Sequence, residues 1–333
     1  MLKQSIGKRT ALIAIIGFAL VLVLIPSIGS AVNTARCQNR DRIAVWSTRQ
    51  SLVLPLGNFE VVCADGSGAI SHWIPHQLTD DGTVAIAFSP DGAQVAFASF
   101  GNPRSSTDVS IYVMNTDGSE IARLLSMGYD TPRLAWSPNG KLLAFDGRLS
   151  AGYGIYVVNL DCIHVQSSCA AIASYLGEGT NPSWSPNGDK IVFEMIKDRR
   201  ADISDYDVWT MDANGANRIN LTPDEFQEYD PAWSPDGQTI AFYSSQSPRG
   251  IYVIRPDGSG LTFLTEGNNP AWSPDSRSLL FVTDRNSNGK EIQLSDSYFP
   301  VEALYMIDRD SKITTQLTHN DNELIRHFTW LPK

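Results

Sequence analysis

The chain has 333 residues, of which 42% are hydrophobic and 19% are charged. Enough apolar side chains are present to build a large core, which excludes a chain that is disordered throughout. The net charge of −10 repels phosphate backbones, so nucleic acid is excluded as a partner.

The first 36 residues have the layout of an export segment. An apolar run over 11–25 follows three basic side chains: Lys3, Lys8 and Arg9. Pro26 ends the run, and Gly29 and Ala31 then satisfy the small-x-small cleavage pattern of a signal peptide. Extended by a few residues, the same run is also long enough for a membrane-anchoring helix.

Either interpretation places residues 37–333 outside the cytoplasm, in the periplasm or the extracellular space. The protein is then secreted or anchored by its N-terminal helix, and the membrane is contacted only through that segment. Arg36 directly precedes Cys37, where a lipidation signal needs a small residue, so we do not expect a lipoprotein.

An aromatic residue followed by a turn of the Ser-Pro-Asp-Gly type recurs along the chain. The anchors are spaced by 48, 48, 49 and 39 residues: Phe88, Trp136, Trp184, Trp233 and Trp272. Repeats of this length, each with four short strands, are typical of β-propeller blades. We therefore predict an all-β propeller of four-stranded antiparallel blades.

One repeat shows the predicted blade in full. After the strand that ends at Trp233, Pro235 presets the turn and Gly237 accepts the left-handed conformation that follows. The next three strands are predicted at 239–244, 251–254 and 261–265.

The two ends of the chain supply the parts of one further blade. Residues 42–47 and 59–62 read as second and third strands without a first strand, and residues 328–332 read as a first strand alone. One C-terminal strand and three N-terminal strands would complete a composite blade and close the ring without a free sheet edge. With five whole blades, the expected total is six.

The strand order also predicts the pairing of the four cysteines. Cys37 precedes a second strand and Cys63 ends the third strand beside it, while Cys162 and Cys169 flank an enlarged turn. We predict the disulfides Cys37–Cys63 and Cys162–Cys169. The alternative, a metal site, needs all four ligands to converge, and the two pairs fall on different blades.

These repeats resemble the WD40-like repeats of the TolB family. The resemblance covers residues 42–333 and rests on the anchor-turn motif and on four shorter matches: Ile111 to Met114, Asp117-Gly118, Leu264-Thr265 and Leu317-Thr318. It implies a propeller that binds protein partners. TolB itself carries an α/β domain before its propeller, whereas here the first strand follows the export segment almost directly, so that domain's contacts are not implied.

Similar repeats also form the propellers of prolyl-oligopeptidase-like peptidases and of an oligogalacturonate lyase. The sequence contains no Gly-x-Ser-x-Gly nucleophile motif, which argues against a peptidase. No catalytic residue is assigned.

The predicted strand order places the irregular connections on one face of the propeller, called the loop face below. Four connections there vary in length: 99–108, 197–205, 246–250 and 284–300. Long irregular loops on a rigid frame commonly carry recognition.

Residues just before each inner strand are expected to ring the mouth of the central channel on this face. The candidate binding residues are Tyr129, Asp130, Asn181, Tyr229, Asp230, Asn269, Arg326 and His327. Aromatic, amide and charged groups around a concave mouth suit a peptide or a sugar. In the alternative interpretation, the Asp and Asn residues only stabilise the turn into the next strand.

One loop resembles the start of a calcium-binding loop. Asp284, Asn286 and Asn288 alternate as oxygen donors, and Gly289 follows at the sixth position. Ser295 stands at the twelfth position in place of the usual glutamate, so an ordinary polar hairpin is the alternative.

We expect a non-catalytic binding or scaffold module that engages an envelope protein or a peptide segment, with no cofactor unless the calcium loop is filled. The alternative is a polysaccharide-active, lyase-like enzyme, and a glycan is then the ligand. It requires Asp130, Asp230, Arg326 and His327 to converge on one pocket.

Overall fold

A computed structural model describes ten stretches of the chain, and the statements below concern them: 42–49, 57–64, 69–70, 83–100, 108–128, 130–164, 169–196, 205–283, 303–318 and 323–331. The predicted export segment lies outside these residues. Within them, none of the helices combines the length and the apolar character that crossing a membrane demands.

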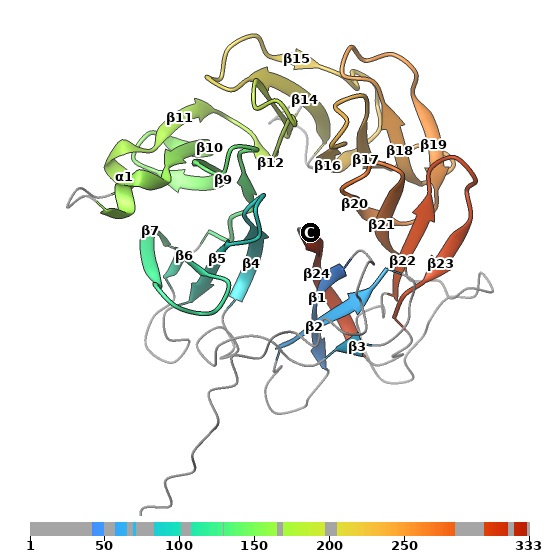
Figure 1. Cartoon of the computed structure of the whole chain (residues 1–333). Helices are drawn as coiled ribbons and strands as arrows, with labels where there is room; N and C mark the ends of the chain where they lie inside the picture. The colour runs from blue at the N-terminus through green and yellow to red at the C-terminus, as the bar shows by residue number, and fades with distance from the viewer. Residues whose placement is uncertain are drawn as a thin grey trace, which may run out of the picture. The chain divides into compact units, whose positions relative to one another are not determined.

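The described strands form six four-stranded antiparallel sheets (Figure 1). The first two sheets built from consecutive strands cover residues 83–177. One holds β4 (Thr83–Phe88), β5 (Gln94–Phe100), β6 (Val109–Asn115) and β7 (Ala122–Gly128). The next holds β8 (Leu134–Trp136), β9 (Leu142–Leu149), β10 (Gly152–Asn159) and β11 (Ser174–Gly177).

Three more sheets repeat this pattern over residues 180–316. The third holds β12 (Thr180–Trp184), β13 (Lys190–Ile196), β14 (Tyr206–Asp212) and β15 (Ile219–Asn220). The fourth holds β16 (Glu228–Trp233), β17 (Ile240–Ser244), β18 (Gly250–Ile254) and β19 (Thr262–Thr265). The fifth holds β20 (Asn268–Trp272), β21 (Ser278–Thr283), β22 (Ala303–Asp308) and β23 (Thr314–Gln316).

The remaining sheet is built differently, and it corrects the expected blade count. Its order is β24-β1-β2-β3, and its strands come from both ends of the chain: β24 (Glu323–Leu331), β1 (Arg42–Arg49), β2 (Gly57–Cys63) and β3 (Ala69–Ile70). Continuous four-strand blades number five, and the expected count of six is reached only when this sheet, assembled from both ends of the chain, is included. The N-terminal helix of the same expectation is not among the described elements.

The first strand of each sheet contacts the first strand of the next. These contacts run from β4 through β8, β12, β16 and β20 to β24, and β24 contacts β4 again. Within the unit Val32–Lys333, the first strands therefore form a closed ring.

Each Ser-Pro-Asp-Gly turn is stabilised by its own side chains. In the first repeat the Ser89 hydroxyl donates to Asp91 Oδ1 at 2.6 Å and accepts the Gln94 N–H at 2.9 Å. Gly92 has a φ of 70°, the left-handed region that glycine enters without steric cost. In the fifth repeat Ser276 takes this place at a φ of 61°, and its hydroxyl accepts the Asp236 N–H of the preceding sheet.

The tryptophan anchors connect neighbouring sheets. Four indole N–H groups donate to a carbonyl of the preceding sheet at 2.9 to 3.2 Å: Trp136 to Ala87, Trp184 to Ala135, Trp272 to Ala232 and Trp330 to Ala271. Trp233 differs, because among the described residues its Nε1 has no partner, while its backbone N–H reaches the Ser183 hydroxyl at 3.2 Å. The same rings fill the apolar core between sheets.

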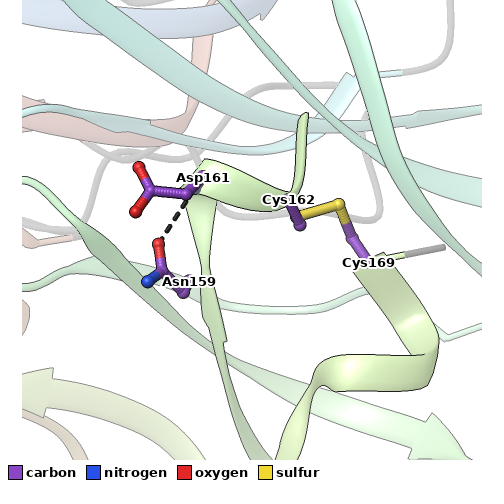
Figure 2. Close-up of a disulfide and its surroundings, with 4 residues drawn as sticks. All are labelled: Asn159, Asp161, Cys162 and Cys169. Atoms are coloured by element: carbon purple, nitrogen blue, oxygen red, sulfur yellow. Dashed lines mark hydrogen bonds between the residues drawn. A yellow bond between two sulfur atoms is a disulfide. The ribbon is translucent and has the colours of Figure 1, made fainter. Parts of the chain in front are cut away.

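The predicted disulfide Cys162–Cys169 is confirmed, and each of its two cysteines lies in a short helical segment (Figure 2). Cys162 lies in the short helix η1 (Leu160–His164), and Cys169 begins α1 (Cys169–Ile172). Both half-cystines are buried, and both helices contact β7 of the preceding sheet. Cys37 of the other predicted pair lies outside the described residues, so Cys37–Cys63 stays a prediction.

Candidate binding site on the loop face

Four tyrosines lie on the loop face and are contributed by three blades. They are called the tyrosine row below: Tyr153 (β10), Tyr206 (β14), Tyr229 (β16) and Tyr243 (β17). Second strands end and third strands begin on this face, and first strands begin there too. The pairing registers Tyr153↔Arg148, Ile196↔Tyr206 and Tyr229↔Tyr243 place each tyrosine at the loop-face end of its own sheet.

Three of the four rings are at contact spacing. The Tyr206 and Tyr229 ring centres are 5.5 Å apart, and those of Tyr229 and Tyr243 are 6.1 Å apart. Tyr153 is close enough to Tyr206 for the neighbouring phenol to help raise its pKa, after the larger effects of burial and of Asp146. Tyr153 is 42% exposed and the other three rings are partly exposed, so the row is available for contact.

A buried carboxylate, Asp146, joins two blades beside the row. It is 3% exposed and accepts hydrogen bonds from three donors: the Arg133 N–H at 2.5 Å, the Asn181 N–H at 3.0 Å and the Thr180 hydroxyl. Because a buried charge is stable only when such donors surround it, the carboxylate holds the start of β12 in place.

A second buried carboxyl, Glu194, repeats this arrangement one blade further on. Its Oε1 accepts the Asp230 N–H at 2.6 Å and the Asn181 side-chain amide at 2.8 Å. The same Asn181 amide also donates to Asp230 Oδ1 at 3.0 Å. One amide thus bridges two carboxyl groups, which are called the acid pair below.

The acid pair has unusual protonation. Burial raises the pKa of Glu194 to about 8, and the nearby Asp230 carboxylate adds to the rise. Burial also raises the pKa of Asp230, although the Arg133 guanidinium and the Asn181 hydrogen bond act in the opposite direction. At neutral pH the acid pair therefore retains a proton and holds less negative charge than two free carboxylates.

The structure places four of the eight predicted mouth residues in the row or in the networks beside it: Asp130, Asn181, Tyr229 and Asp230. Asn181, Tyr229, Asp230 and Asn269 lie within β12, β16 and β20, not before them as expected, and Asp130 lies just before β8. Arg326 and His327 fall within β24, and nothing is described of their side chains. Tyr129 lies outside the described residues. The proposed binding role of all eight stays a prediction.

The backbone supports the structural interpretation for three of these residues. Asn181, Asp230 and Asn269 have φ values of 52°, 55° and 55°, in the left-handed region that Asn and Asp tolerate better than other side chains. The left-handed backbone conformation therefore explains why Asn or Asp stands directly before proline at these three positions. The acid pair shows that Asn181 and Asp230 also take part in a network between blades.

Sequence reasoning missed several residues of the site. Asp146 and Glu194 each follow the buried phenylalanine of a second strand, where the other continuous blades have Ala98, Tyr243 and Val282. An acid at a position that is otherwise apolar or aromatic was a detectable signal. Tyr153 and Tyr206 gave a weaker sequence signal, because a tyrosine at the start of a third strand is not by itself unusual.

Two further predictions concern metal and catalysis. The calcium loop with Asp284, Asn286 and Asn288 lies outside the described residues, so calcium binding stays a prediction. Within the described part of the chain, no three His, Cys, Asp or Glu side chains form a group suited to a metal ion. Asp130 Oδ2 accepts the Arg148 N–H at 2.6 Å, and Asp230 belongs to the acid pair, so the two carboxyls of the lyase alternative serve separate networks.

Fold and site together define a β-propeller with an aromatic surface on its loop face. The fold is that of a TolB-like propeller. The crystal structure of TolB from Acinetobacter baumannii superimposes with a TM-score of 0.67 at 18% identity, over 88% of this chain and 67% of that chain. A putative TolB from Agrobacterium tumefaciens gives 0.57 at 19% identity, over 88% and 99%.

Sequence comparison agrees over a shorter range. A protein TolB homolog of Chlorobium luteolum is 30% identical over 208 residues, which are 60% of this chain and 42% of that protein. The chain spans less than half the length of the curated relatives it matches. No family model matches. At these identities the likeness to solved structures is one of fold.

Proposed function

We propose that the protein is a non-catalytic binding or scaffold propeller of the cell envelope, which engages a protein or peptide through the tyrosine row and the adjoining mouth of the channel. The observation that carries this proposal is the row itself, four rings across three blades on the face with the irregular loops. Tyrosine offers a large amphipathic contact area and loses little side-chain entropy on binding. A rigid sheet frame keeps such a surface preorganised.

Other observations support the envelope location. The TolB likeness suggests a protein that works there, as does the N-terminal sequence with its basic residues, apolar run and small residues. The disulfide Cys162–Cys169 is typical of a protein from an oxidising compartment. We infer that the propeller works in the periplasm or outside the cell, either free or attached through its first 36 residues.

Site-specific photo-cross-linking tests this proposal. The cross-linker p-benzoyl-phenylalanine replaces Tyr153 in one variant and Ile313 in a matched control, and both are expressed in the native host and irradiated in intact envelopes. Ile313 is suitable because it is 67% exposed and follows the end of β22, on the face away from the row. We expect one protein to be captured reproducibly from position 153 and not from 313, with its identity read by mass spectrometry.

Equal capture at both positions, or no protein captured at either, would contradict the proposal. If lectin-like retention on envelope polysaccharide is found instead, and is lost when Tyr153 is changed to Ala, the ligand is a glycan and the protein-binding proposal fails.

A further inference from the structure

The tyrosine row carries an exposed arginine at each end. The Arg148 guanidinium carbon lies 5.9 Å from the centre of the Tyr153 ring. At the other end, Arg249 donates from Nη2 and Nε to the Tyr243 hydroxyl at 3.0 and 3.3 Å. Both arginines are exposed, yet an aromatic partner restricts each one. Less side-chain entropy is therefore lost when either arginine binds a ligand.

The acidic groups beside the row are largely occupied within the protein. Asp146 takes three donors, and Asp130 takes the Arg148 N–H. The acid pair shares the Asn181 amide, and its burial favours the protonated form. Asp205 also lies near Tyr229 and is only partly exposed. Among the described residues, the charged side chains in direct contact with the end rings of the row are the two arginines, which favours a ligand of negative charge.

The spacing of the rings suits an extended chain. Alternate side chains of a β-strand point to the same side and are roughly 6.6 Å apart. The ring centres of Tyr206, Tyr229 and Tyr243 are separated by 5.5 and 6.1 Å. Successive side chains on one side of an extended peptide would thus meet Tyr206, Tyr229 and Tyr243 in turn.

We propose that the tyrosine row binds an extended acidic peptide segment of the partner, with carboxylate side chains at both ends of a short apolar stretch and Arg148 and Arg249 each pairing with one carboxylate. This inference rests on the proposed function, and it specifies the chemistry of the partner. A guanidinium group binds a carboxylate through two parallel hydrogen bonds, which gives direction as well as strength. The tyrosine rings pack against the apolar stretch between the two carboxylates.

Selection from a random peptide library displayed on phage tests this proposal on the purified full chain. We expect the enriched peptides to carry Asp or Glu on both sides of an apolar stretch. The double variant Arg148→Glu, Arg249→Glu should bind the best of these peptides at least about tenfold more weakly for each arginine changed. Arg255→Glu is the matched control, because Arg255 is also exposed but lies in the turn after β18, away from the loop face.

Tyr243→Phe provides an independent variant that keeps the ring and removes only the hydroxyl that positions Arg249. It should weaken binding of the acidic peptides and leave binding of their glutamine analogues unchanged. Because both arginines are exposed, thermal unfolding of the arginine variants should match the wild type.

Enrichment of neutral or basic peptides, no enrichment at all, or equal loss in Arg255→Glu would overturn the inference. The proposed function is tested separately by photo-cross-linking. If a protein is captured at position 153 while the selected peptides show no acidic preference, the partner chemistry is wrong and the binding function stands.

Discussion

Glu194 is the residue whose protonation should be visible in the stability of the protein. Its pKa is raised by burial from 4.5 to about 8 in the folded state. Between these pH values the folded protein holds a proton that the unfolded chain has lost, so stability falls as pH rises through this window. Below the unfolded-state pKa of 4.5 both states are protonated and the full stability is present.

Glu194→Gln should therefore raise the melting temperature relative to wild type at about pH 9 and have a much smaller effect near pH 5. The glutamine oxygen can still accept the Asp230 N–H, so the contact between blades is kept. Thermal unfolding across this pH range measures the effect, with roughly 2–4 °C expected for each kcal/mol.

Glu228→Gln is the comparison, because burial raises the pKa of Glu228 only to about 7 and its effect should end at lower pH. Parallel pH profiles for the wild type and Glu194→Gln would show that the acid pair does not hold the proton assigned to it.

At the residue scale, some residues of the site could be predicted from the sequence and others could not. Asn181 and Asp230 were found because they stand directly before a proline and an anchor motif. Glu194 was not found, because its contact with Asp230 joins residues 36 positions apart and depends on how two blades meet. Repeats predict strands well, whereas contacts between side chains of neighbouring blades depend on register and on bulges such as the shift between Tyr229 and Ala232.

At the scale of elements, the insert with two short helices between β10 and β11 packs against the preceding blade and so connects two blades. Cys162 and Cys169 belong to one apolar cluster with Leu124, Leu125 and Met127 of β7. The disulfide closes a loop with a sequence separation of only 7, so it restrains the insert locally. The insert in turn covers part of β7, the outer strand of the preceding sheet.

Replacing both cysteines by alanine should loosen this contact and lower stability by about 2–3 kcal/mol. Hydrogen–deuterium exchange is the measurement, and faster exchange is expected in β7, β10 and β11 with little change in β17 and β18. Equally faster hydrogen–deuterium exchange in all sheets would instead mean that the disulfide stabilises the protein globally. The insert would then not stabilise only the contact between these two blades. Reduction of the wild type with a thiol should reproduce the pattern of the double variant.

At the scale of elements, local sequence predicts the turns better than it predicts the outer strands. Ser-Pro-Asp-Gly specifies its own hairpin through contacts within six residues, as in Ser89, Asp91 and Gln94, so each turn was predictable. The fourth strands were less so. β15 has two residues and β23 has three, because an outer strand has a neighbour on one side only and its ends are not specified by packing.

At the scale of the whole molecule, Trp330 connects the two ends of the chain to the rest of the ring. It lies in β24, is 8% exposed, and donates its indole N–H to Ala271 of the preceding sheet at 3.2 Å. The ring packs with Leu280, Leu304 and Leu317. β24 also pairs with β1, so the same strand joins the N-terminal strands to the fifth continuous blade.

Trp330→Ala should therefore destabilise the protein by about 3–5 kcal/mol, the cost of removing a large buried side chain. Trp330→Phe keeps most of the apolar contact and loses the indole N–H, so a smaller loss is expected, of which about 1 kcal/mol comes from the hydrogen bond. Chemical denaturation followed by fluorescence measures both, and limited proteolysis shows where the chain opens first. If closure depends on β24, the alanine variant should be cut first in the N-terminal strands β1 and β2, although the mutation lies at the other end of the sequence. First cleavage next to Trp330 alone, with β1 and β2 protected, would show that the N-terminal strands are held by other contacts.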